Sequence, residues 1–197
     1  MDHPYHLMSS SFVNSHITVP GRGTKATPSV VDRRLDVATD VINHEVGVDL
    51  SLYSNPTLIP DRFFFSFTPI ITIRHPAHAT PSAYRAWLKM GAGIPHFDFP
   101  VSTSYKFERL VFESFKSYAE GETATMPIVV EGEKLVRDPQ AQMKKVCNVL
   151  GLNEGEISYS WDSPERGKGT KAGDAFFKTL NGSNGIIPDS VGRSLFP

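Results

Sequence analysis

Apolar residues along the chain follow two kinds of spacing, and their order predicts strands that alternate with helices. Two short, bounded apolar runs, 69–73 and 126–130, have the length and β-branched content of buried strands. Apolar residues at helical spacing follow each run, over 78–87 after the first and 139–150 after the second. A further amphipathic helix is predicted over 104–120. This order indicates an α/β domain with a mostly parallel sheet flanked by helices.

The first part of the chain carries a shorter version of the same pattern. Residues 16–19 predict a short strand, a loop rich in glycine and basic residues follows over 20–25, and Thr27 is placed to cap a helix. Strand, glycine loop and helix form the context that a phosphate-binding loop needs, because its backbone N–H groups cradle the anion. A surface turn is the alternative interpretation.

The structure of three connecting segments is predicted from their aromatic, glycine and proline residues. The aromatic run 61–67 is expected to be a short helix or turn that packs on the sheet. Glycines and prolines predict a loop over 91–100, and 131–138 is expected to be a turn before Pro139 opens the next helix. We expect Gly121 to end the helix over 104–120.

Composition narrows the classes of function. With 197 residues and a net charge of −1, the chain offers no support for a nucleic acid or a membrane surface as partner. It lacks an apolar run of membrane-spanning length and a signal-peptide layout, so a cytoplasmic location is expected. Its single cysteine, Cys147, allows no disulfide and is predicted in the core. We expect one domain over 16–180 between flexible tails, 1–15 and 181–197; the oligomeric state is left open.

The turn after the first predicted strand carries the candidate site. Arg74 ends the strand, Pro76 prevents its continuation, and Ser82 follows eight positions after Arg74 near the start of a helix. A guanidinium and a hydroxyl would converge there with free N–H groups and the helix dipole, which favours a phosphate. The competing interpretation is that Arg74 pairs with an acidic neighbour and Ser82 caps the helix.

Three segments of the chain, one of which contains these residues, resemble sulfotransferases, a family of the P-loop NTPase superfamily. IRHPAHATPSAYRAW places Arg74, Pro76 and Ser82 as in the 3′-phosphate-binding segment of that family. PIVVEGEKLVRDPQAQMKKVCNVLGL is similar to its later strand, turn and final helix, and NPTLIPDRF looks like its fungal-type branch. The resemblance implies a sulfotransferase-like fold and sulfuryl transfer from 3′-phosphoadenylyl sulfate (PAPS) to the hydroxyl or amine of a small molecule.

The resemblance also implies roles for residues elsewhere. Pro20 and Gly23 fall in register with the compact phosphate loop of the family, but the lysine is displaced, so the loop is degenerate or was lost, by evolution or by truncation at the N-terminus. The family uses a histidine or glutamate as general base, which makes His44 and His96 candidates. The implied nucleotide-binding residues are Arg74, Ser82, Arg22, Thr24, Lys25 and Lys168.

A second hypothesis starts from the degenerate phosphate loop and the 13 phenylalanines. A fold whose nucleotide site has decayed would use no cofactor and would act as a cyclase- or pericyclase-like enzyme of secondary metabolism, or as a binding protein. Its apolar pocket would be lined by Phe65, Trp87, Phe97 and Phe99. We expect no metal, because His75 and His78 lack a clustered third ligand.

Overall fold

The computed structural model describes seven stretches of the chain and divides it into two compact units. The described residues are 3–16, 52–94, 96, 98–122, 124–162, 173–177 and 182–186. The first unit comprises Met1–Ile71 and Gly93–Ile128, and the second comprises Thr72–Ala92 and Val129–Pro197. Because each unit is compact by itself, the two are described separately below.

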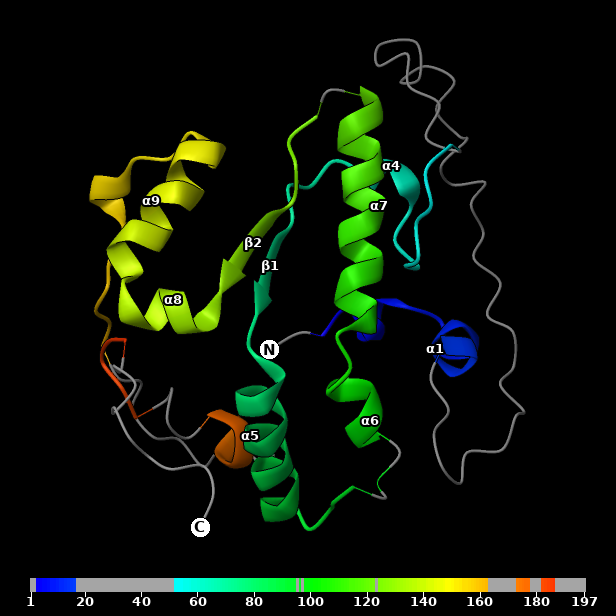
Figure 1. Ribbon diagram of the computed structural model, residues 1–197, viewed down its shortest axis with the longest axis vertical. Helices are drawn as coiled ribbons and strands as arrows, with labels where there is room; N and C mark the ends of the chain where they lie inside the picture. The colour runs from blue at the N-terminus through cyan, green and yellow to red at the C-terminus, as the bar shows by residue number, and fades with distance from the viewer. Residues whose placement is uncertain are drawn as a thin grey trace. The chain divides into compact units, whose positions relative to one another are not determined.

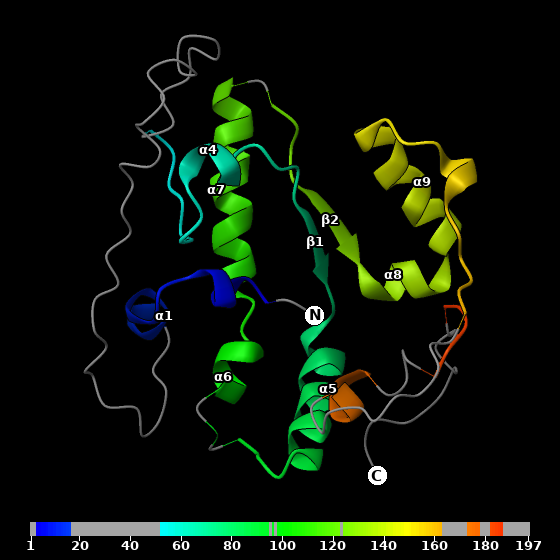
Figure 2. The same ribbon diagram turned by 180° about the vertical axis from the view of Figure 1, so that it is seen from behind.

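A parallel two-stranded sheet forms where the apolar runs predicted it. Strands β1 (Ile70–Ile73) and β2 (Ile128–Glu131) are hydrogen-bonded neighbours and lie side by side in both Figure 1 and Figure 2. Helix α5 (Pro76–Lys89) follows β1, and helices α8 (Gly132–Arg137) and α9 (Pro139–Leu150) follow β2. The predicted α/β class, with a parallel sheet flanked by helices, is therefore confirmed and is compatible with a sulfotransferase-like fold.

Helix α5 begins two residues earlier than its apolar spacing predicted. His75 is the N-cap, and its imidazole Nδ1 accepts a hydrogen bond from the N–H of Ala77 at 3.2 Å. Pro76 fits the first helical position, because its fixed φ suits a helix and its missing N–H would have had no partner there. Pro81 lies inside the helix and has no N–H to give to the carbonyl of Ala77.

Both ends of helix α9 are set by residues close to it in sequence. The Asp138 side chain accepts a hydrogen bond from the N–H of Ala141 at 3.0 Å, and Pro139 occupies the first position. Gly151 ends the helix with φ of 67°, in the left-handed region that favours glycine. Cys147 faces the interior with 1% of its surface exposed, so its predicted core position is confirmed.

The first unit is organised around helix α7 (Lys106–Glu122). Phe107, at its start, packs with Met8, Val13 and Val101 in one core cluster. Phe115, two turns later, packs with Phe64 and Phe65 in a second cluster. The shorter elements that contribute to these clusters are η1 (Pro4–Leu7), α1 (Ser10–His16), α4 (Asp61–Phe64) and α6 (Asp98–Ser102).

Several predicted connections are wrong in detail. The segment 131–138 is mostly helix α8 rather than a turn, because Glu, Lys, Leu and Arg are good helix formers. The loop predicted over 91–100 ends early, since α6 begins at Asp98, and α7 continues through Gly121. The short helix predicted in 61–67 is confirmed as α4, and the core cluster that holds its Phe64 contains Phe115 of α7 and, in the described part of the chain, no residue of the sheet.

The N-terminal predictions meet the structure only in part. Residues 3–16, most of the expected flexible tail, contain η1 and α1, and Met8 and Val13 from this segment are buried. The strand predicted over 16–19 begins at the last residue of α1, and its other residues, the glycine loop and the helix after Thr27 lie outside the described residues. The division into one domain with two tails stays a prediction. None of the helices in the described stretches is long and apolar enough to cross a bilayer.

Candidate functional site

The carboxyl ends of the two strands bring Arg74 and Glu133 together within the second unit. Arg74 directly follows β1, and Glu133 lies in the first turn of α8, directly after β2. The Nε–H of Arg74 donates to Oε1 of Glu133 at 3.2 Å, and the backbone N–H of His75 donates to Oε2 at 3.4 Å. Parallel strands place their carboxyl ends at one edge of a sheet, which is where ligands of α/β folds bind.

The environment of Glu133 favours its ionised form. Its side chain is 17% exposed, whereas that of Arg74 is 45% exposed. Desolvation by itself would raise the pKa of Glu133, but hydrogen bonds from its own N–H and that of His75, together with the Arg74 guanidinium, hold the pKa below its ordinary value. Glu133 is therefore a carboxylate at neutral pH, and it balances the charge of Arg74.

The first N–H groups of α5 are already hydrogen-bonded. The imidazole of His75 takes the N–H of Ala77, and the carbonyl of His75 takes those of His78 and Ala79 at 2.9 and 3.0 Å. The prediction of free N–H groups at this helix start is therefore wrong. His75 thus accepts hydrogen bonds from the N–H groups that have no partner within the first turn of a helix.

Ser82 lies in the second turn of α5, about 9 Å along the helix axis from Pro76. Its side chain is half-buried, and it shares a helix face with His78 and the buried Ala86. No hydrogen bond between described residues involves the Ser82 hydroxyl. The competing interpretation is confirmed for Arg74, which pairs with an acidic neighbour, and is wrong for Ser82, since His75 caps the helix. The phosphate-binding role of both residues stays a prediction.

His96, the candidate base that the structure describes, belongs to the first unit. Its Nδ1 accepts a hydrogen bond from the N–H of Asp98 at 3.3 Å, and the Oδ2 of Asp98 lies 4.0 Å from the same nitrogen. While Nδ1 accepts this bond, Nε2 is the ring nitrogen that carries a proton. A base role through Nδ1 would require release of the Asp98 N–H, and that role stays a prediction.

The aromatic residues predicted to line a pocket are divided between the units. Phe65 is 6% exposed and packs against Phe64, Phe115 and Tyr118, and Phe99 is 8% exposed on α6; both belong to the first unit. Trp87 belongs to the second unit, where its ring meets that of Phe176 edge-on at 6.0 Å between centroids. The predicted pocket stays a prediction.

Six of the predicted residues lie outside the described part of the chain. These are Arg22, Thr24, Lys25, His44, Phe97 and Lys168. The described candidates are therefore Arg74 and Ser82 for the nucleotide, His96 for the base, and Phe65, Trp87 and Phe99 for the pocket.

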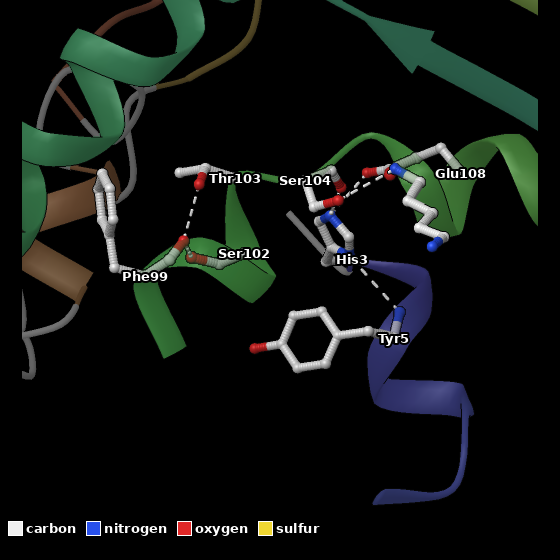
Figure 3. Close-up of polar contacts among 8 residues, drawn as sticks. His3, Tyr5, Phe99, Ser102, Thr103, Ser104 and Glu108 are labelled. Carbon is white, nitrogen blue, oxygen red and sulfur yellow. Dashed lines mark hydrogen bonds and ion pairs between the residues drawn. The ribbon is translucent and has the colours of Figure 1, made fainter. Parts of the chain in front are cut away.

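A separate polar cluster in the first unit joins His3 to the start of α7. The Nε2 of His3 lies 2.8 Å from Oε1 of Glu108 and 3.1 Å from the carbonyl oxygen of Ser104, while its Nδ1 accepts from the N–H of Tyr5 at 3.4 Å (Figure 3). While Nδ1 accepts that bond, Nε2 is the ring nitrogen that carries a proton and faces the two oxygens. The cluster ties the N-terminal segment to α7.

Comparison with curated proteins finds two that are similar to part of this chain. Sulfotransferase ppzF from Metarhizium rileyi is 25% identical over 118 residues, which are 55% of this chain and 34% of that protein. The ppzF sulfotransferase from Metarhizium majus is 26% identical over the same shares. The chain is similar to fungal sulfotransferases. It spans about a third of the length of these relatives. No protein-family model and no solved structure matches.

The sequence reasoning missed Glu133. It lies inside the sulfotransferase-like segment that starts at Pro127, two residues after β2, where the resemblance places a turn. The available signal was the pairing of the two predicted strands, because an acid just after one parallel strand lies beside a base just after its neighbour. Arg74 was identified correctly as the charged group at the strand end, and its partner follows from that pairing.

Proposed function

We propose that this chain is a sulfotransferase-like enzyme that transfers a sulfuryl group from PAPS to a hydroxyl or amine of a small molecule. One observation carries the proposal: Arg74, half-exposed, stands at the carboxyl end of β1 and precedes Ser82 on α5, in a chain similar to fungal sulfotransferases. A P-loop ancestry with a degenerate phosphate loop, cytoplasmic location and a role in small-molecule biosynthesis belong to the same proposal.

The described residues fit a phosphate monoester such as the 3′-phosphate of PAPS. A guanidinium offers a planar fork of N–H groups that matches two phosphate oxygens, and a hydroxyl can donate to a third. Arg74 would supply the fork and Ser82 the hydroxyl. By resemblance, Lys168 would add charge at the same phosphate, and Arg22, Thr24 and Lys25 would hold the 5′-phosphosulfate.

The nucleotide would supply an activated sulfuryl group. His44 or His96 would take the proton of the acceptor hydroxyl, so that the new O–S bond forms as the S–O bond to the 5′-phosphate breaks. The products are the sulfate ester, the protonated histidine and adenosine 3′,5′-bisphosphate. Basic residues would hold the reacting groups in line and stabilise the charge on the leaving phosphate, which is the main contribution a protein makes to such transfers.

Calorimetric titration with adenosine 3′,5′-bisphosphate tests the proposal. We expect binding in the micromolar range, and a loss of about 2 to 4 kcal/mol in Arg74→Ala, the scale for a bidentate charged contact. Arg109→Ala is the control, because Arg109 is 80% exposed on α7 and, among the described residues, its ion-pair partner is Glu113 of the same helix. An affinity that Arg74→Ala leaves unchanged would contradict the site.

A second candidate is supported by the Arg74–Glu133 pair itself. A guanidinium that is already neutralised by a carboxylate is what a decayed nucleotide site would contain. The fold would then act on a small molecule without a nucleotide, as a cyclase- or pericyclase-like enzyme or a binding protein. Absence of nucleotide binding at millimolar concentration would favour this candidate, and a search for an apolar ligand near Trp87 would follow.

A further inference from the structure

We propose that Glu133 controls the phosphate affinity of the Arg74 site, because its carboxylate occupies the donors that an incoming phosphate needs and must be displaced when the phosphate binds. This inference rests on the proposed function in one respect: the natural anion is taken to be the 3′-phosphate of the nucleotide. The chemistry itself concerns any oxyanion of similar shape.

The contacts of Glu133 are those of a bound anion. One carboxylate oxygen accepts from the side-chain Nε–H of Arg74 and the other from the backbone N–H of His75, at 3.2 and 3.4 Å. A phosphate presents oxygens at a comparable spacing and accepts from the same kinds of donor. Within the described residues, Glu133 therefore takes the place of a ligand at the carboxyl end of β1.

Charge opposes simultaneous occupancy by Glu133 and a phosphate. The desolvation of Glu133, only 17% exposed, makes a second anion beside it costly. The neighbouring cation on α8, Lys134, does not offset this cost, because its Nζ lies 2.6 Å from a carboxylate oxygen of Glu131. The Arg74–Glu133 pair has no net charge, so a phosphate that binds Arg74 must compete with Glu133 for the guanidinium.

The opposite role for Glu133 makes the opposite prediction. A carboxylate that merely held Arg74 in the orientation for binding would be needed by the ligand, and its removal would weaken binding. Competition and positioning therefore differ in the sign of the effect of one substitution. This sign can be measured without any assay of activity.

The experiment compares wild-type protein with Glu133→Ala, Glu133→Gln and the control Glu131→Ala in calorimetric titrations with adenosine 3′,5′-bisphosphate. We expect Glu133→Ala to bind about tenfold more tightly than wild type, since a like charge beside a half-exposed site is removed. Glu133→Gln should lie between the two, because its amide oxygen still accepts one bond. Glu131→Ala removes the same charge nearby, from a carboxylate that is paired with Lys134, and should change affinity by about twofold at most.

A second probe separates this inference from the proposed function. Inorganic sulfate is titrated into the wild-type and Glu133→Ala proteins while the backbone amide of His75 is followed by NMR. Tighter sulfate binding in Glu133→Ala, with no nucleotide binding in any variant, would support the role of Glu133 and refute the nucleotide. If Glu133→Ala binds neither probe more tightly than wild type, the inference is overturned. Should Glu133→Ala fail to fold, as judged by circular dichroism, the near-isosteric Glu133→Gln decides by the same criterion.

Discussion

The two units differ in what their described residues bury. In the first unit, aromatic rings fill the interior: Phe107 is fully buried, and the rings of Phe64 and Phe115 lie 4.5 Å apart between centroids. In the second unit, the buried apolar side chains are smaller, namely Ala86, Val130, Val146 and Cys147. Aromatic side chains contribute the largest apolar areas to a core, so packing dominates the first unit.

The second unit relies more on caps and charges, and this contrast bears on the Arg74–Glu133 pair. Asp138, His75 and Gly151 set helix ends there, and each contributes on the scale of a single hydrogen bond or turn. An ion pair with one half-exposed partner contributes little to folding, typically 0 to about 1 kcal/mol. The pair therefore matters more for what binds at the strand end than for stability.

The largest effect is expected for Phe107→Ala. Deleting a fully buried phenylalanine ring should lower the free energy of unfolding by about 3 to 5 kcal/mol. The measurement is denaturant unfolding, followed by circular dichroism for the whole chain and by tryptophan fluorescence for the second unit. Trp87 and Trp161, the only two tryptophans of the chain, both belong to that unit. Phe63→Ala, at a side chain that is 49% exposed, is the control. Equal losses in the two variants would remove the contrast between the units.

Ser82→Ala should weaken nucleotide binding by roughly 2 kcal/mol, the loss of one hydrogen bond to a charged group, and leave the unfolding midpoint nearly unchanged. Calorimetry measures the first quantity and denaturant unfolding the second. Thr80→Ala, at an exposed position of the same helix, serves as the control. A loss of stability without a loss of affinity would assign Ser82 to packing and count against the phosphate site.

Asp138→Ala removes the N-cap of α9 and should lower the free energy of unfolding by about 1 kcal/mol. Asp138→Asn should restore most of that loss, because an asparagine side chain accepts the same bond from Ala141. Tryptophan fluorescence follows the unfolding of the second unit. If alanine and asparagine behave alike, the charge of Asp138, and not its cap, stabilises α9.

The smallest effect concerns a polar contact within the aromatic unit. A 2.6 Å hydrogen bond to Glu122, with added desolvation, raises the pKa of Tyr53 to about 12. Because the folded pKa lies above the unfolded value near 10, the contact stabilises fully below pH 10, and this contribution is lost as pH rises to about 12. Unfolding measured across this window should show a steeper loss for wild type than for Tyr53→Phe. Identical slopes would show that Glu122 does not hold the phenol.

Local signals were sufficient for the strands and for the longer helices. The runs that form β1 and β2 are short, β-branched and bounded, and α9 lies between Asp138 and Gly151, whose roles depend only on neighbouring backbone. The six residues of α8 are too few to show a helical period. Helices near the N-terminus depend on the burial of Met8 and Val13 against Phe107, about a hundred positions away in sequence.

The same division applies to the candidate site. Arg74 and Ser82 could be found because both lie in one continuous strand–turn–helix segment. Glu133 is brought to Arg74 only by strand pairing, and the N–H of Ala77 in α5 is occupied because of the rotamer of His75. The sequence predicted a charged residue at the strand end, whereas the partner of Arg74 could be known only from the three-dimensional contacts.

The buried thiol of Cys147 can be used to measure how often the second unit opens. A thiol reagent can react with a side chain that is 1% exposed only while α9 is transiently displaced. Because the chain contains no other cysteine, the labelling rate measures this opening event alone, without an introduced probe. Comparing the labelling rate of Cys147 with and without nucleotide would therefore show whether a ligand at the carboxyl ends of the strands slows the opening of α9.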